Sequence, residues 1–158
     1  MAKQRFYFDL PTENDDDAFN EAAELGCELS RQDSEINRIV FLASHKDATG
    51  WLQRVYEEKY GPKIICQLYN GFELKPGFPK FQILLGKDYS EKTAKHDVVI
   101  VMGTASNFLP EIEGLSSVRA IIAIPSVMNN KLVLDWLETY KPDKIRGQNT
   151  LWEVPPRE

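Results

Sequence analysis

The sequence predicts a three-layer α/β fold, in which a mostly parallel sheet of about five or six strands carries helices on both faces, as in Rossmann-like proteins. Several short segments are continuously apolar, which is typical of parallel strands buried on both faces; the clearest lie at 39–43 and 97–102. Segments with helical spacing of apolar residues separate them. Short joints between such elements favour right-handed crossovers, which stack helices against the sheet.

The first half of the chain alternates predicted strands and helices. The aromatic segment 5–10 predicts the first strand. The acidic run 15–17 suits the start of a helix, because the unpaired N–H groups there favour negative charge. A second strand at 39–43 leads into a second helix, which the glycine and proline of 60–62 should end. We expect a third strand at 63–69, with the apolar sequence KIICQLY.

The second half is less regular before it returns to apolar strands. In order, we expect a loop at 70–80, a short strand at 81–85, core strands at 97–102 and 118–124, a last helix at 127–140, and an edge strand near 150–154. The pattern predicts a single α/β domain over residues 1–158, with a core at 1–143 and a tail at 144–158.

Composition narrows the class of protein. Of the 158 residues, 42% are hydrophobic and 27% charged, as in globular domains. The net charge of −5 argues against general binding of nucleic acids or anionic membranes, which need a basic field. No apolar stretch approaches the roughly 18 residues of a membrane span, and the N-terminus lacks a signal-peptide pattern. We therefore expect a cytoplasmic protein in which Cys27 and Cys66 are buried free thiols.

The candidate ligand-binding residues follow from the predicted sheet. In open α/β sheets, ligands bind outside the carboxyl ends of the strands, where hydroxyl groups, amides and helix N-termini suit a phosphate or carboxylate. The loops after the strands at 39–43 and 97–102 supply Ser44, His45, Lys46, Thr49, Gly103, Thr104, Ser106 and Asn107. The loops after the first and fifth core strands add Thr12, Asn14, Ser126, Asn129 and Asn130. Helix capping is the alternative role of these residues.

Two residues or segments in this set have specific alternatives. His45 is either an acid/base group beside Lys46 or an exposed loop residue. Segment 103–107 is either the floor of the site, where Gly103 lets a ligand approach the backbone, or a cap for the next helix. Phosphate-loop, dinucleotide-binding, nucleophile-elbow and zinc-binding motifs are all missing. We therefore expect no metal site and no cofactor, and the catalytic residues, if any, stay unknown.

One stretch resembles a known family. The sequence RIVFLASHKDATGWLQRVYEEKYGPKIICQLY, at 38–69, resembles the C-terminal α/β domain of pyruvate kinase, and YFDLPTENDDDAFNEAAELG, at 7–26, resembles small stand-alone proteins of that fold. In them a strand ends in a small hydroxyl residue, here Ser44, and a helix begins near a Thr–Ala pair, here Ala48–Thr49. Because that domain carries regulation rather than phosphoryl transfer, the resemblance implies a binding module.

These observations leave several functions open. The first is a module that binds a small anion such as a phosphometabolite or nucleotide, and regulation is one use of such a module. The alternative is a non-catalytic subunit for protein–protein interaction or homo-oligomers. The aromatic first strand, the segment around Cys27 and the NTLW sequence at 149–152 are similar to the chi subunit of bacterial DNA polymerase III, which is an interaction module. An enzyme is the third hypothesis.

Overall fold

The computed structural model describes residues 3–8, 16–46, 50–74, 76–124 and 131–145. Within these residues, six strands form one parallel sheet in the order β3-β2-β4-β5-β1-β6. The strands are β1 (Gln4–Phe8), β2 (Arg38–Ala43), β3 (Lys80–Leu85), β4 (Asp97–Met102), β5 (Val118–Ile124) and β6 (Asp143–Ile145). The prediction that 39–43 and 97–102 are neighbouring interior strands is confirmed.

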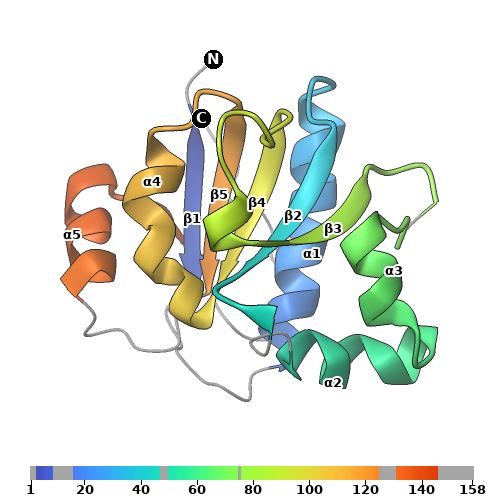
Figure 1. Ribbon diagram of the computed structural model, residues 1–158. Coiled ribbons are helices and arrows are strands. Elements are labelled where there is room, and N and C mark those ends of the chain that lie inside the picture. The colour runs from blue at the N-terminus through green and yellow to red at the C-terminus, as the bar shows by residue number, and fades with distance from the viewer. Residues whose placement is uncertain (1–2, 9–15, 47–49, 75, 125–130, 146–158) are drawn as a thin grey trace.

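Helices cover both faces of the sheet, so the predicted three-layer fold is confirmed (Figure 1). They are α1 (Asp16–Gln32), α2 (Gly50–Tyr60), α3 (Ile64–Asn70), α4 (Leu109–Glu113) and α5 (Lys131–Tyr140), with the 3₁₀ helices η2 (Gly86–Asp88) and η3 (Gly103–Phe108). One face packs against α1, α2 and α3. The other packs against η3, α4, α5 and the segment 86–96.

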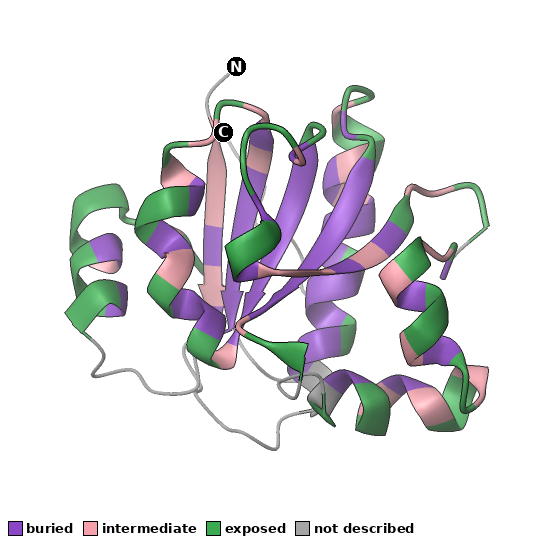
Figure 2. Ribbon diagram, viewed as in Figure 1, coloured by how far each residue is buried: buried purple, intermediate pink, exposed green. Residues whose placement is uncertain are grey.

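The two hydrophobic layers follow directly from the alternation of side chains along the strands. In β2, Ile39 and Phe41 point into the layer beneath α1, whereas Val40 and Leu42 point into the layer beneath α4. Every residue of β2 and β4 is buried, as Figure 2 shows for these central strands. A continuous apolar sequence is therefore what these positions require, and it is why they were predictable.

The predicted third strand at 63–69 is wrong, because this segment forms α3. Ile64 and Leu68, four residues apart, are its buried side chains, while Cys66 is exposed. An apolar run this short has the same pattern in a buried strand and in a helix. The burial expected for Cys66 is wrong for the same reason, whereas Cys27 on α1 is buried as expected.

The remaining elements agree with the sequence pattern to different degrees. The short strand expected at 81–85 is β3, at one edge of the sheet. At the other edge, β6 spans Asp143–Ile145, whereas the pattern placed an edge strand of the tail near 150–154. The described part of the last helix begins at Lys131. The edge strand expected near 150–154 lies outside the described residues. No helix in the described part of the chain is long and apolar enough to cross a membrane.

A buried ion pair joins the amino ends of β2 and β4. Arg38 donates two hydrogen bonds to the Asp97 carboxylate, both at 2.9 Å, and Asp97 is fully buried. The Tyr89 hydroxyl donates to the same carboxylate at 2.5 Å, and the Lys95 backbone N–H does so at 3.0 Å. Arg38 also donates to the Thr93 carbonyl at 2.7 Å. The pair therefore ties segment 86–96 to the amino ends of β2 and β4.

Candidate functional site

The carboxyl ends of β2 and β4 bring two of the predicted residues into contact. Ser44 directly follows β2, and Thr104 follows β4 after one glycine. Because these strands are neighbours, the two side chains meet: their hydroxyl oxygens lie 2.6 Å apart, and either can donate the hydrogen bond. Ser44 is half-buried and Thr104 is exposed. This pair forms the centre of the candidate site.

The chain leaves these two strands toward opposite faces of the sheet. After β2, α2 packs Leu52 into the layer shared with α1. After β4, η3 and α4 place Ala105 and Leu109 in the other layer. Neighbouring parallel strands whose connections diverge in this way form a topological switch point, the usual place for a ligand in an open α/β sheet. Ser44 and Thr104 stand at this point.

The turn that begins η3 is held by its own hydrogen bonds. Gly103 has a φ of +56°, in the left-handed region that glycine adopts at little cost. The Ser106 hydroxyl donates to the Gly103 carbonyl at 2.8 Å, and Ser106 is buried. Its hydroxyl therefore takes part in the hydrogen bonding of the turn. Asn107, by contrast, is exposed near the end of η3.

The other predicted residues of this loop follow Ser44 in exposed positions or lie outside the described ranges. His45 and Lys46 are exposed in the loop that follows Ser44. Thr49 lies outside the described residues, as do Thr12, Asn14, Ser126, Asn129 and Asn130. The structure thus brings together Ser44 and Thr104, and it assigns Ser106 to the support of the turn. Among the described residues, no group of three histidine, cysteine or acidic side chains could hold a metal ion.

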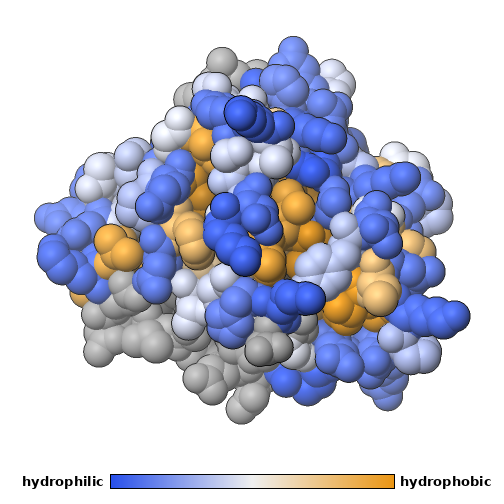
Figure 3. Space-filling view, viewed as in Figure 1, coloured by the Kyte–Doolittle hydropathy of each residue, from blue (hydrophilic) through white to orange (hydrophobic). Residues whose placement is uncertain are grey.

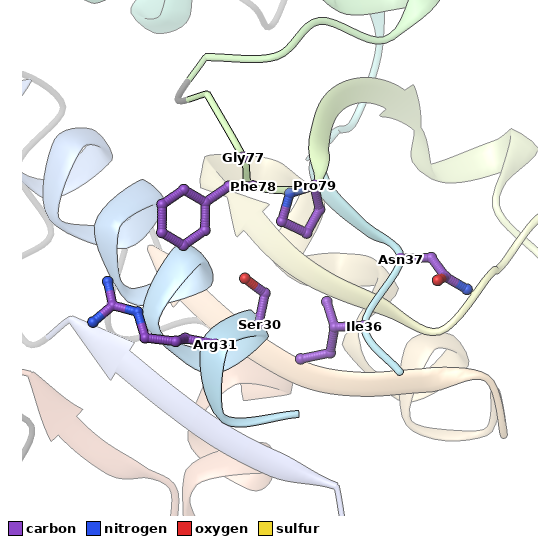
Figure 4. A pocket seen from close by; sticks show the side chains of 7 residues that line it. All are labelled: Ser30, Arg31, Ile36, Asn37, Gly77, Phe78 and Pro79. Carbon is purple, nitrogen blue, oxygen red and sulfur yellow. The ribbon is translucent and has the colours of Figure 1, made fainter. Parts of the chain in front are cut away.

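A shallow groove lies at the opposite ends of the strands, next to the amino ends of β2 and β3. It has a volume of about 510 Å³. Figure 4 shows its lining, which is Ser30, Arg31, Ile36, Asn37, Gly77, Phe78 and Pro79. The Arg31 guanidinium lies 5.6 Å from the centre of the Phe78 ring. This groove was not predicted, because its lining comes from the end of α1 and from loops at the amino ends of the strands, whereas ligands in open sheets are expected at the carboxyl ends.

The clearest pKa shifts belong to groups that support the fold. Burial, and then the negative charge of Asp97, raise the pKa of the Tyr89 hydroxyl far above its usual range. Burial lowers the pKa of the Lys3 amine, although the charge of Glu113 opposes this effect. Lys3 donates to the carbonyls of Glu113 and Leu115 at the end of α4, each at 2.9 Å. These groups lie away from the Ser44–Thr104 pair and stabilise helix ends and the sheet.

Comparisons of the chain with models of known protein families, with curated proteins and with solved structures found no match.

Proposed function

We propose that this chain is a binding module for a small anion, such as a phosphometabolite or nucleotide, at the carboxyl ends of β2 and β4. The contact between the Ser44 and Thr104 hydroxyls carries the proposal. Two hydroxyl groups 2.6 Å apart can each donate to an anion that replaces their mutual hydrogen bond. Their place at a topological switch point supports the same use.

The surroundings of the pair also favour a small ligand over a large polyanion. Lys46, two residues after Ser44, adds a positive side chain to the exposed loop. The first turn of α2, which begins at Gly50, has backbone N–H groups without partners inside the helix. The chain as a whole carries a net charge of −5, which repels extended polyanions. A phosphate or carboxylate group on a small molecule fits both the local and the overall charge.

Calorimetric titration of Ser44→Ala and Thr104→Ala tests the proposal. The probes are inorganic phosphate, pyrophosphate and the common nucleotides, first screened by thermal shift with the unaltered protein. Because a hydrogen bond to a charged group contributes roughly 1.5–3 kcal/mol, each variant should bind at least about tenfold more weakly. Thr139→Ala, which removes an exposed hydroxyl on α5, is the matched control and should bind as the unaltered protein does. Equal affinity in all three variants would contradict the proposal.

A protein–protein interaction subunit is the second candidate, and the surface of α5 is the observation that favours it. Leu132, Leu134 and Tyr140 are 38%, 47% and 40% exposed. Figure 3 shows apolar surface over this helix, at the left of the view. Light scattering over a range of concentrations measures whether copies of the chain associate. A dimer that Leu134→Ser dissociates, together with no ligand in the thermal-shift screen, would favour this second function.

A further inference from the structure

The 3₁₀ helix η3 crosses the end of a strand that it does not directly follow. It begins at Gly103, after β4, and it ends at Phe108. Phe108 lies against Gly86, the residue that directly follows β3. Since β2 lies between β3 and β4 in the sheet, η3 spans the carboxyl end of β2. Ser44 leaves β2 at this same place.

The contact between Phe108 and Gly86 leaves no room for a side chain. A Cβ atom added at Gly86 would lie no more than 2.7 Å from three carbon atoms of the Phe108 ring, which is closer than real Cβ contacts. Gly86 is buried, and the Phe108 ring is half-buried in the layer beneath α4. The φ of Gly86 lies outside the left-handed region, so space for the ring, rather than backbone strain, requires glycine here. The two residues therefore form a fitted contact.

The two ends of η3 are thus fixed by different strands. Thr104 lies at the β4 end, in contact with Ser44 of the β2 loop, and Phe108 lies at the β3 end. Ala105 and Leu109 are fully buried and anchor the helix from below. The contact of Phe108 with Gly86 adds a restraint at the far end of η3, four residues after Thr104.

We propose that Phe108 is a positioning residue for the candidate site: its ring, seated on Gly86, holds η3 across β2 so that Thr104 stays against Ser44. The consequence for ligand binding rests on the proposed function, whereas the effect on the geometry of the pair does not. Removal of the ring should let η3 tilt, and a methyl group at position 86 should displace the ring and move η3 in the same way.

An engineered disulfide measures the geometry without any ligand. The reporter protein carries Ser44→Cys and Thr104→Cys, with Cys66→Ser to remove the exposed native thiol. A disulfide forms only within a narrow range of Cβ separations, about 3.5–4.5 Å, so its rate of formation in a glutathione buffer reports how the two positions lie. Adding Phe108→Ala or Gly86→Ala to the reporter should slow this rate at least about tenfold, since the geometry allowed is so narrow.

Two controls separate positioning from a general loss of stability. Ile64→Val on α3 removes a buried methylene far from η3 and should leave the rate unchanged. Phe108→Leu, which still reaches Gly86, should restore most of the rate, and it keeps the test usable if Phe108→Ala fails to fold. In the reporter that carries both Phe108→Ala and Gly86→Ala, the disulfide should form at the same rate as with Phe108→Ala alone, because both changes act through one contact. A rate in Phe108→Ala equal to that of the reporter alone would overturn the proposal.

Titration with inorganic phosphate, in the protein with its native hydroxyls, extends the test to the site. Phe108→Ala should weaken phosphate binding, and Phe108→Leu should restore it. If the unaltered protein binds neither inorganic phosphate nor pyrophosphate nor any of the common nucleotides, the proposed function fails while the slower disulfide still supports the positioning role. If Phe108→Ala slows the disulfide but binds phosphate with unchanged affinity, the positioning role at the site is overturned and the proposed function stands.

Discussion

Replacement of Asp97 by asparagine tests the buried ion pair between β2 and β4. The side chain of Asp97 is fully buried and that of Arg38 is 11% exposed, so neither charge reaches much water. Asparagine keeps the shape of the side chain but removes the charge, which leaves the Arg38 guanidinium buried with neutral oxygen partners from Thr93 and Gln82. Breaking a buried pair by removing one partner costs about 3–5 kcal/mol.

Urea unfolding followed by circular dichroism at pH 7 measures this loss. With a slope of roughly 2 kcal/mol per molar urea, the unfolding midpoint of Asp97→Asn should fall by about 2 M. Asp88→Asn, which changes an exposed carboxylate on η2, is the matched control and should shift stability by less than about 0.5 kcal/mol.

The double variant tests whether the charges act as a pair. Arg38→Met combined with Asp97→Asn removes both charges, so its loss of stability should be smaller than the sum of the two single losses by at least about 1 kcal/mol. Additive losses, or a loss below about 1 kcal/mol in Asp97→Asn, would refute the reasoning from burial and hydrogen bonding.

Two further predictions concern Asp33 and Tyr56. Burial raises the pKa of the Asp33 carboxyl, but hydrogen bonds from the Glu35 N–H and from Arg119 outweigh it, so the net pKa is below the usual value. This carboxyl stabilises the fold above its unfolded pKa of about 3.9 and loses that effect as pH falls through the folded pKa. The difference in melting temperature between the unaltered protein and Asp33→Asn should therefore shrink as the pH is lowered from about 6 to about 2. A difference that stays constant over this range would contradict the prediction. The Tyr56 hydroxyl is buried and has no hydrogen-bond partner among the described residues. Tyr56→Phe should therefore raise the free energy of unfolding by up to about 1 kcal/mol, and the melting temperature with it. Tyr89→Phe also removes a tyrosine hydroxyl, but this one donates a hydrogen bond to Asp97, so the melting temperature of this variant should fall. A lower melting temperature in both variants would refute the explanation.

The sequence pattern predicted those parts of the fold in which one segment decides its own structure. β2 and β4 are buried on both faces, so their continuous apolar sequences identify them. The segment 63–69 was predicted as a strand but forms α3. Its structure depends on packing against β3, and the sequence of the segment itself carries no signal for that contact. β6 has only three residues, of which two are exposed, so it carries almost no apolar signal.

The candidate site was also predictable only where local sequence decides the structure. The loops after β2 and β4 were predictable, because they follow recognisable strands. The contact of Ser44 with Thr104 was not, since it depends on which strands are neighbours, and the order β3-β2-β4-β5-β1-β6 leaves no trace in local periodicity. Nor was the burial of Ser106 predictable, because its hydroxyl is used within the turn. Likewise, Phe108 and Gly86 meet only because η3 spans β2.

The position of β1 inside the sheet has a consequence for folding as the ribosome releases the chain. β1 lies between β5 and β6, and its Gln4 pairs with Ala120 and its Phe6 with Asp143. Before β5 emerges, β2 can pair with β3 and with β4, and α1, α2 and α3 can pack against these strands. The apolar side chains of β1, including the fully buried Phe8, therefore have no strand partners until β5 and β6 have been made. Pairing this distant in sequence is slow, and an unpaired apolar strand is prone to aggregate, so we expect β1 to be an aggregation-prone part of the nascent chain during that interval.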